Sequence, residues 1–438
     1  MNSLAMSLTN KAWLNLKRFC RVNKMIAESN MPAIRFKRFS GEWEEKILGE
    51  LVQLENGFAF KSKYFKKEPT DVIVLTPGSV NIGGGFQAEK GQYYDVKQDV
   101  PSKYVFKSGD MFITMTDLTP TAQALGFPAI VPNDDNTYLH NQRLGKLVGF
   151  EDDINFLFNL LSTPKKQKEV VLTSSGTTVK HTSPSKFLSR YSCFPKKAEQ
   201  TKIGNYFQQL DTLIVQHQQK HDKLLNLKKA LLEKMFPKQG ATLPEIRFKG
   251  FSGEWEEKTL GELTDYKNGR GHEDKQKTYG KYELINLNSI AIDGGLKFSG
   301  KFVDEAESTL DKNDLVMILS DVAHGNLLGR VALIPVSNTY VLNQRVALLR
   351  PSSDIFPLFI LYNINAHQPY FKAQGAGMSQ LNISRSSVEK FSSYIPEKNE
   401  QAKIGNLFKQ LDTLINQHQA QLKKLNNIKQ ACLEKMFV

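Results

Sequence analysis

The stretch that decides the fold is PAIRFKRFSGEWEEKILGEL at residues 32–51, because it returns as PEIRFKGFSGEWEEKTLGEL at residues 244–263. These two copies, called the boxes below, are identical at 17 of 20 positions, whereas average residue frequencies give about one chance match. A second pair follows, since residues 198–236 match residues 399–437 at 26 of 39 positions. The chain is therefore written twice, and each copy consists of a box, a divergent block and a conserved helix.

Between each box and its helix lies a block, at residues 52–197 and 264–398, that diverges much more strongly. The two blocks still share short strings in the same order, such as NQR at 141–143 and 343–345. Both are dense in short runs of β-branched and aromatic residues broken by Gly, Pro and Asn, which predicts many short strands with a few helices. We therefore expect two α+β globules that share one fold and differ in surface.

Apolar residues in both conserved helices are spaced alternately three and four apart, which is typical of a helix that buries one narrow stripe. A helix of 39 residues rises about 58 Å, so we expect a strut rather than a core element. The economical partner for each helix is its own copy, running antiparallel, although a helix of another subunit is an alternative. The predicted seam residues are Ile203, Phe207, Leu210, Ile214, Leu224, Ile404, Phe408, Leu411, Ile415 and Leu425.

The predicted fold class is α+β, with two α/β domains held apart by two long antiparallel coiled-coil helices in a pseudo-twofold internal repeat. Residues 1–31 have no counterpart in the second half, and a poorly ordered extension is favoured over a basic DNA-contacting arm. Met31 could be the biological start. The predicted segments are this extension at 1–31, a first domain at 32–197, a central conserved helix at 198–236, a linker and second domain at 237–397, and a C-terminal conserved helix at 398–438.

Composition sets limits on the class of protein. The 438 residues carry 58 Lys and Arg against 45 Asp and Glu, a formal charge of +13, which favours a polyanionic partner. The 3 Cys are far apart, which argues against a disulfide framework or a thiolate zinc site. Apolar runs are too short for a membrane helix, and there is no secretion signal. We expect a cytoplasmic bacterial protein.

The motifs of DNA-modifying and nucleotide-hydrolysing enzymes are missing from the sequence. It has no glycine-rich cofactor loop with an Asn/Asp-Pro-Pro-Tyr/Phe string, no GxxxxGK[ST] loop and no PD…(D/E)xK nuclease motif. DEAE at 304–307 is interpreted as a solvated acidic turn. His217 and His221 have metal-site spacing, but the second copy has Leu422 in place of His221, so polar residues that set helix register are favoured. We predict no catalytic and no metal-binding residues.

Basic, aromatic and small polar residues are mixed in four segments of the blocks, at 58–67, 174–181, 266–282 and 375–382. Such side chains can neutralise phosphates and contact base edges, although each segment alone could equally be a solvated loop. The candidate DNA-binding residues are Lys61, Lys63, Tyr64, Lys66, Thr177, Thr178, Lys180, Lys267, Arg270, His272, Lys275, Lys277, Ser379, Gln380 and Asn382.

Residues that recur in both copies have a different expected role. Gln142 and Arg143, which recur as Gln344 and Arg345, are expected to hold the common scaffold rather than to read sequence. Each box carries a tryptophan in a locally acidic GEWEEK string. This string would repel phosphate, so it is interpreted as a docking surface, with a buried structural tryptophan as the equal alternative. The candidate docking residues are Trp43 and Trp255.

Together these residues resemble the specificity subunit of type I restriction-modification enzymes. The resemblance covers residues 32–438 and is carried by both GEWEEKxLGEL strings, both IGNxFxQLDTLIxxHQ helices with their xLEKMF ends, and the two variable blocks. It implies that each block is a target recognition domain that reads one half of a split, asymmetric DNA site, while the paired helices fix the gap between the halves.

The resemblance also implies partners and cofactors. Two methyltransferase subunits would dock on this chain, and separate motor and nuclease subunits would join them, with S-adenosylmethionine, ATP and Mg²⁺ bound by those partners. The chain itself would bind none of these and would not be an enzyme. Two alternatives remain open on the sequence: a free-standing two-domain DNA-binding regulator, which would bind DNA tightly without partners, and a self-contained methyltransferase or nuclease.

Overall fold

A computed structural model describes residues 30–95, 97, 100–119, 121–238, 240–322, 325–378 and 380–438. Residues 1–29 of the predicted extension lie outside this range. The chain forms two compact units. Unit 1 contains the residues up to Gln216 together with 422–438, and unit 2 contains residues 217–421. The division crosses both long helices, so each unit consists of one globule and half of each helix, whereas the sequence analysis treated the helices as separate segments.

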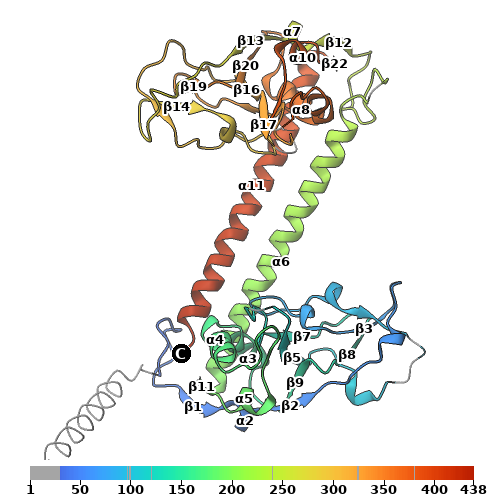
Figure 1. Cartoon of the computed structure of the whole chain (residues 1–438), viewed down its shortest axis with the longest axis vertical. Helices are drawn as coiled ribbons and strands as arrows, with labels where there is room; N and C mark the ends of the chain where they lie inside the picture. The colour runs from blue at the N-terminus through green and yellow to red at the C-terminus, as the bar shows by residue number, and fades with distance from the viewer. Residues whose placement is uncertain are drawn as a thin grey trace, which may run out of the picture. The chain divides into compact units, whose positions relative to one another are not determined.

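Unit 1 contains the first set of elements, shown in blue to green in Figure 1. In chain order they are β1 (Glu44–Ile47), α2 (Leu48–Leu51), β2 (Gln53–Asn56), β3 (Val72–Val74), β4 (Gln92–Tyr93), β5 (Met111–Thr114), β6 (Thr116–Asp117), β7 (Pro128–Ile130), β8 (Thr137–Leu139), β9 (Leu144–Val148), α3 (Ile154–Leu161), α4 (Pro164–Leu172), β10 (Lys180–His181), α5 (Pro184–Leu188), β11 (Tyr191–Phe194) and the first half of α6 (Lys197–Lys234), with short 3₁₀ turns at Ser62–Tyr64, Pro77–Ser79, Ala88–Lys90 and Ser102–Tyr104.

Unit 2 repeats this order. Its elements are β12 (Glu256–Thr259), α7 (Leu260–Leu263), β13 (Thr264–Asn268), β14 (Tyr282–Ile285), β15 (Phe302–Val303), β16 (Leu315–Ile318), β17 (Ser320–Val322), β18 (Val331–Leu333), β19 (Tyr340–Leu342), β20 (Val346–Pro351), α8 (Pro357–Ala366), α9 (Gln368–Ala373), β21 (Gln380–Asn382), α10 (Arg385–Glu389), β22 (Ser392–Ile395) and the first half of α11 (Lys398–Lys435), with one 3₁₀ turn at Leu287–Ser289.

The strands of the two units are connected in the same way. A four-stranded sheet has the order β2-β9-β5-β7 in unit 1 and β13-β20-β16-β18 in unit 2. A three-stranded sheet has the order β4-β3-β8 in unit 1 and β15-β14-β19 in unit 2, with its central strand parallel to β8 or β19. Two-stranded ribbons join β1 to β11 and β6 to β10, and likewise β12 to β22 and β17 to β21. The divergent blocks therefore share one topology.

Local sequence explains the main elements of each globule. The central strands β5 (MFIT) and β16 (LVMI) are buried at every position, as expected of a continuous apolar run. Helix α3 begins where the Asp153 carboxylate accepts a hydrogen bond from the Phe156 N–H at 2.9 Å, and α4 begins with Thr163 as its cap and Pro164 in its first turn. These are common helix starts, because the caps satisfy N–H groups that have no partner within the helix.

The first box holds the two helix ends in unit 1. Arg35 forms an ion pair with Glu199 in the first turn of α6, with Nε and Oε1 2.6 Å apart. The Ile34 N–H donates to the carbonyl of Lys435 in the last turn of α11 at 2.9 Å. One short segment therefore contacts the start of α6 and the end of α11.

The second box makes the same contacts in unit 2. Arg247 pairs with Glu400 in the first turn of α11 at 2.8 Å, and Ile246 donates to the carbonyl of Lys234 at the end of α6 at 2.9 Å. The Glu400 side chain is completely buried. The two boxes are therefore nearly identical because each makes the same contacts with the helix ends of its unit.

The prediction that Trp43 and Trp255 form a docking surface is wrong, because both side chains belong to cores. They are 2% and 3% exposed. The Trp43 ring packs against Phe156 of α3 and Phe437 at the C-terminus, with ring centroids 5.8 and 6.4 Å away. The acidic residues around each tryptophan are exposed, so the local charge of the string does not report the direction of its aromatic side chain.

Contacts between the two long helices run antiparallel within each unit. In unit 1, Lys429 of α11 pairs with Asp211 of α6 at 2.5 Å. In unit 2, His217 of α6 and His418 of α11 face each other with their Nδ1 atoms 2.9 Å apart. Among the described residues, no helix is long and apolar enough to cross a membrane.

The predicted seam residues are buried or half-buried, but many of them lie in globule cores. Ile203, Phe207 and Leu210 share a buried cluster with Phe156 of α3. The first turns of α6 are thus core elements, which corrects the expectation of a strut for this part of the helix. Seven of the ten are buried and the rest are half-buried: Ile203, Phe207, Leu210, Ile404, Phe408, Leu411 and Ile415 in the first group, and Ile214, Leu224 and Leu425 in the second.

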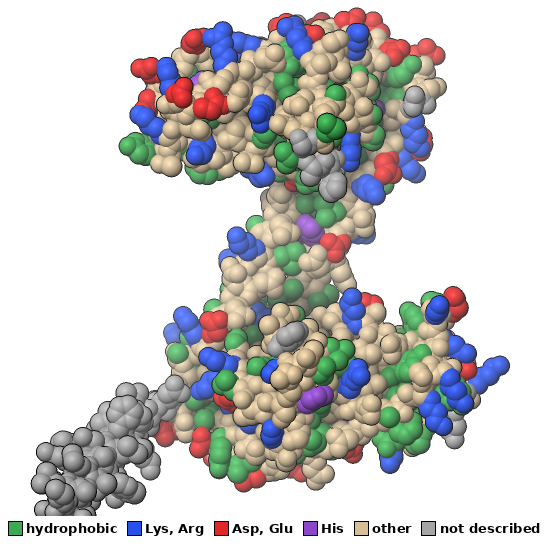
Figure 2. Space-filling view, in the orientation of Figure 1, with side chains coloured by type: hydrophobic (Ala, Val, Ile, Leu, Met, Phe, Trp, Pro, Cys, Tyr) green, Lys and Arg blue, Asp and Glu red, His purple; other side chains and the backbone are tan. Residues whose placement is uncertain are grey.

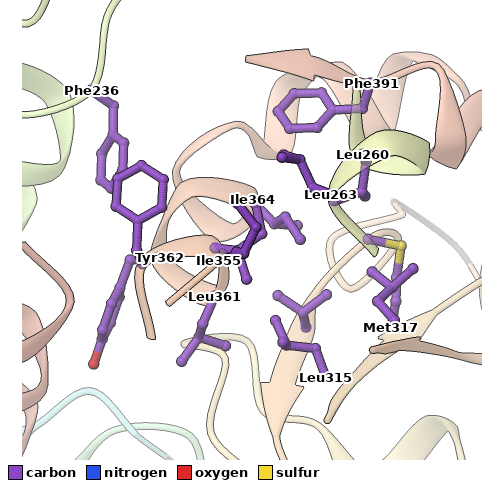
Figure 3. Close-up of a cluster of buried hydrophobic side chains, with 14 of the residues drawn as sticks. Phe236, Leu260, Leu263, Leu315, Met317, Ile355, Leu361, Tyr362, Ile364 and Phe391 are labelled. Atoms are coloured by element: carbon purple, nitrogen blue, oxygen red, sulfur yellow. The ribbon is translucent and has the colours of Figure 1, made fainter. Parts of the chain in front are cut away.

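The core of unit 2 shows the same arrangement in Figure 3. Phe236, just after α6, lies near Tyr362 of α8, and the sheet residues Leu315 and Met317 belong to the same cluster. The ring of Phe236 also stacks on Phe408 of α11, with centroids 6.0 Å apart. Each globule therefore includes the end of one long helix and the beginning of the other.

Candidate nucleic-acid interface

In unit 1 the fold brings three separate loops together around the NQR turn. The Gln142 N–H donates to the carbonyl of Phe58 at 3.1 Å, and the carbonyl of Arg143 accepts from Met115 at 2.9 Å. The carbonyl of Met115 in turn accepts from the N–H of Thr182 at 3.0 Å. The turn therefore lies between the first basic loop and the hairpin that carries Thr177 and Thr178.

Unit 2 has the same ladder. The carbonyl of Arg345 accepts from Leu319 at 2.9 Å, and the carbonyl of Leu319 accepts from Ile383 at 2.9 Å. On the other side, Arg270 and Asn343 form a parallel bridge. We call these loops the recognition face of each unit: residues 57–67, 141–143 and 174–182 in unit 1, and 269–277, 343–345, 375–378 and 380–383 in unit 2.

A glycine permits the close approach that builds each face. A Cβ atom on Gly57 would lie 2.2 Å from the carbonyl oxygen of Asn141, and one on Gly269 would lie 1.8 Å from that of Asn343. Both distances are far inside van der Waals contact, so any larger residue would push the first loop away from the turn. The Asn-Gly string before each first loop is thus a structural requirement of the face.

The first loop of unit 1 presents basic side chains over an aromatic cluster. The Lys63 ammonium lies 4.8 Å from the centre of the Tyr64 ring, Lys66 pairs with Asp95 at 3.0 Å, and Lys61 is exposed. Tyr64 packs beside Tyr94 with ring centroids 6.1 Å apart. Figure 2 shows Lys and Arg side chains gathered at the end of unit 1 that carries β3.

The hairpin of unit 1 is the second part of its face. The hairpin is closed by paired hydrogen bonds of 2.9 Å between Ser175 and His181, and the side chains of Thr177 and Thr178 at its tip are exposed. Lys180 lies opposite Asp117 in the β10–β6 ribbon and is half-buried. The two hydroxyls are therefore available to a ligand, whereas part of the Lys180 side chain is covered.

In unit 2 two basic candidates are already paired with acidic residues. Arg270 forms an ion pair with Glu307, and Lys277 pairs with Asp304 at 2.6 Å. The hydrogen bond between the latter two raises the pKa of Lys277 and lowers that of Asp304. Asp304 and Glu307 are the first and last residues of the DEAE string. This exposed turn therefore forms ion pairs with basic side chains of the recognition face and does not contact solvent alone.

The remaining candidates of the first loop in unit 2 are polar and accessible. Lys267 reaches the hydroxyl of Ser308 at 3.2 Å. The His272 Nδ1 lies 2.9 Å from the carbonyl oxygen of Arg270. Lys275 is exposed. Lys267 lies near the end of β13, and His272 and Lys275 lie in the loop that follows it.

The hairpin of unit 2 contains one residue that the sequence analysis missed. Gln380 donates to the Ser320 hydroxyl, and the Asn382 side chain donates to the Gln380 carbonyl at 3.2 Å, while Ser379 lies outside the described residues. Met378, at the hairpin tip, is fully exposed. Its position in the repeat corresponds to Thr177, which was the available signal.

The expectation that Gln142, Arg143, Gln344 and Arg345 hold the common scaffold applies to their backbone atoms. Their backbone atoms hold the turn, as described above, but all four side chains are exposed. The Gln344 side chain donates to the Glu273 carboxylate, whereas the contacts that build the turn use backbone atoms.

The chemistry of the two faces suits contact with a nucleic acid. Among the described residues, no group of three or more His, Cys, Asp or Glu side chains is placed to hold a metal ion. His140, beside the turn of unit 1, is buried, and burial lowers its pKa to about 4, so it is neutral near pH 7. Exposed cations, hydroxyls, amides and aromatic rings are the groups that contact phosphates and bases.

Comparison with known proteins decides the family. The family model described as type I restriction modification DNA specificity domain matches this chain twice, at residues 40–226 and 252–427. The chain belongs to this family. It is a specificity subunit of the type I restriction-modification kind, and such subunits are non-catalytic DNA-recognition proteins. No curated protein sequence matches the chain.

Among the solved structures that resemble this chain, the first described here shows the same fold. The specificity (S) subunit of a type I restriction-modification system from M. genitalium has a TM-score of 0.64 at 16% identity, covering 93% of this chain and 99% of that one. A chain from a study of type I complex assembly and conformational transition has a TM-score of 0.49 at 16% identity, covering 92% and 99%. The HsdS subunit from Thermoanaerobacter tengcongensis has a TM-score of 0.44 at 16% identity, covering 90% and 96%.

Proposed function

We propose that this chain selects the DNA site of a type I restriction-modification complex by reading a bipartite, asymmetric sequence, with one unit on each half-site. The observation that carries the proposal is the pair of recognition faces. They are built by the same backbone ladder, yet most of the side chains that they present differ. Two domains that share a fold but differ in surface are suited to reading two different half-sites.

The differences between the faces concern the groups that read bases. The first loop presents Lys61 and Tyr64 in unit 1 but Arg270 and His272 in unit 2, and the hairpin tip presents Thr177 in unit 1 but Met378 in unit 2. Arginine and histidine offer donors to base edges in the major groove, whereas threonine and methionine favour polar and apolar contacts. Each half-site should therefore have its own sequence.

The gap between the half-sites is assigned to the paired helices, acting as a pseudo-twofold antiparallel coiled coil. Helices α6 and α11 each contain 38 residues, or about 57 Å of helix, and half-sites one turn of DNA apart are centred 34–36 Å from each other. The test is an insertion of four residues at Gln219. It should change the gap but not the bases read, and an unaltered gap in an active complex would contradict the assignment.

The partners are proposed to be two methyltransferase subunits, which carry S-adenosylmethionine, and restriction subunits, which use ATP and Mg²⁺. With the tryptophans buried, a repeated groove is the better docking candidate. A cavity of about 430 Å³ lies between α3 and α6 in unit 1, and one of about 200 Å³ lies between α8 and α11 in unit 2. In each unit an exposed isoleucine precedes the glycines of the groove: Ile82 is 67% and Ile292 is 60% exposed.

The experiment is to co-express the chain with its methyltransferase partner in a host without DNA methylation and to map N6-methyladenine by single-molecule sequencing. A split motif with two unlike halves and a fixed gap is the expected result. Exchange of residues 52–197 for the block of another family member should change one half only. A soluble, assembled complex that leaves no methylation would contradict the proposal and favour a free-standing DNA-binding regulator.

A further inference from the structure

The side chains of Arg143 and Arg345 are kept in both copies although the fold does not use them. Within the described residues, neither guanidinium has a hydrogen bond, an ion pair or an aromatic contact, and both side chains are exposed. The carbonyl groups of these residues accept the hydrogen bonds that build each face, and any residue has such a carbonyl. Two otherwise divergent blocks therefore retain an arginine at the centre of the recognition face for a reason outside packing.

The backbone of unit 2 adds a second observation. Arg345 has a φ angle of +67°, in the left-handed region where a non-glycine residue is uncommon and costs about 1 kcal/mol or more. Glycine would fit this turn without that cost. An arginine retained at a strained, exposed position indicates that its side chain is used.

What both arginines can contact follows from what two different half-sites have in common. If the units read unlike sequences, their base edges differ, and a shared side chain is not suited to both. The sugar-phosphate backbone is the same at every site, and a guanidinium binds phosphate oxygens through two parallel N–H donors. The flanking loops, which differ between the units, are then left to read the bases.

We propose that Arg143 and Arg345 each bind a backbone phosphate of the DNA and thereby fix the position of their unit on its half-site. This inference rests on the proposed function, because it needs DNA on the recognition face. It assigns to the repeated turn a positioning role that is independent of sequence, and it separates this role from base reading by the first loop and the hairpin.

The test is DNA affinity as a function of salt, measured by fluorescence anisotropy on the full-length chain assembled with its methyltransferase partner. The probes are a duplex with the site found by methylation mapping and a duplex of equal length with that site scrambled. The variants are R143A and R345A, with R143K as the charge-preserving change. The matched control is R38A, because Arg38 is also exposed in unit 1 but the second copy has Gly250 there.

Each alanine variant should bind both duplexes about tenfold more weakly, since a phosphate contact carries no sequence information. The slope of log affinity against log salt should become shallower by about 0.9 for each lost contact. R143K should restore most of the slope because it keeps a positive charge, and R38A should leave the slope unchanged. A merely structural role for the arginine would not move the salt slope while the melting temperature stays constant.

Two results would overturn the inference alone. One is that R143A and R345A bind DNA with the same affinity and the same salt slope as the wild type. The other is a loss confined to the mapped duplex, which would make the arginines base readers. If the wild-type complex bound neither duplex, the proposed function would fall as well, so the two failures are distinguishable.

Discussion

The next-to-last residue of the chain is expected to stabilise the first globule, and Phe437→Ala tests this directly. Phe437 is 8% exposed and belongs to the core of unit 1. Phe437 follows the end of α11, a helix that begins in unit 2. A change at the C-terminus should therefore loosen strands that lie more than 280 residues earlier in the sequence.

The magnitude follows from the contacts of the Phe437 ring. Its centroid lies 5.5 Å from that of Phe156, 5.8 Å from Phe207 and 6.4 Å from Trp43. Replacing a buried phenylalanine by alanine costs about 3–5 kcal/mol, and the lower end applies where the surroundings can collapse into the cavity. Because Phe437 lies just beyond the end of α11 at Lys435, its backbone is not held by the helix and can relax. We therefore expect a loss of about 3 kcal/mol in the free energy of unfolding of unit 1.

Hydrogen exchange measured by mass spectrometry resolves the two units in the intact chain. The probes are amides of the buried central strands, β5 in unit 1 and β16 in unit 2. Where exchange reports opening of the unit, a loss of about 3 kcal/mol raises the exchange rate on the order of a hundredfold. Phe437→Ala should have this effect on β5 and should leave β16 near the wild-type rate.

Phe236→Ala is the matched control, because Phe236 is 3% exposed and packs against Phe359 and Phe408 in unit 2. It should accelerate β16 and spare β5. Leu414→Ala, at a residue that is 43% exposed, should change neither strand. Equal acceleration of both strands by Phe437→Ala, or none, would refute the placement of the C-terminus in the core of the first globule.

Three further predictions address pH, electrostatics and assembly. His140→Leu introduces the residue that the second copy has at the matching position, Leu342. The pKa of His140 is about 4 in the folded state, below its usual value of about 6.5. As the pH falls, the unfolded state therefore binds a proton at this residue before the folded state does. The free energy of unfolding of wild-type unit 1 should thus fall by up to about 3 kcal/mol between pH 6.5 and 4. Urea titrations across that pH range should show a smaller fall for the variant. Asp304→Asn with Glu307→Gln should free two basic side chains and tighten DNA binding at low salt by about three- to tenfold, measured by anisotropy, with the gain shrinking as salt is raised; weaker binding would contradict the described ion pairs. Ile82→Glu should reduce co-purification of the methyltransferase subunit without lowering the melting temperature, because the side chain is exposed; unchanged co-purification would remove this groove from the docking surface.

Exposure of individual side chains was the least predictable property of the site. The boxes indicated that their tryptophans matter, but the charges beside them suggested a surface, and the rings proved to be buried. The repeated Gln-Arg pairs suggested a scaffold, and their side chains proved to be exposed. In both cases the local sequence is compatible with either a buried or an exposed side chain. The orientation of a side chain depends on the segments that pack against it.

Pairing between distant segments was equally hidden from the sequence. The loop candidates could be named, but their convergence on one turn depends on the backbone ladder through Phe58, Met115 and Thr182. The ion pairs of Arg270 and Lys277 with the DEAE turn join residues that are 37 and 27 positions apart. No periodic pattern links such positions, since their proximity is set by strand order.

The sequence by itself determined the duplication, the long helices and the missing catalytic motifs. These are properties of local composition and spacing: an internal repeat is visible letter by letter, and a helix with one apolar stripe carries its own period. Tertiary structure alone decided that each globule contains half of both helices and that Phe437 packs on Trp43. The physical reason is that burial is a property of contacts between segments, and residues at opposite ends of the chain share no local pattern by which those contacts could be read.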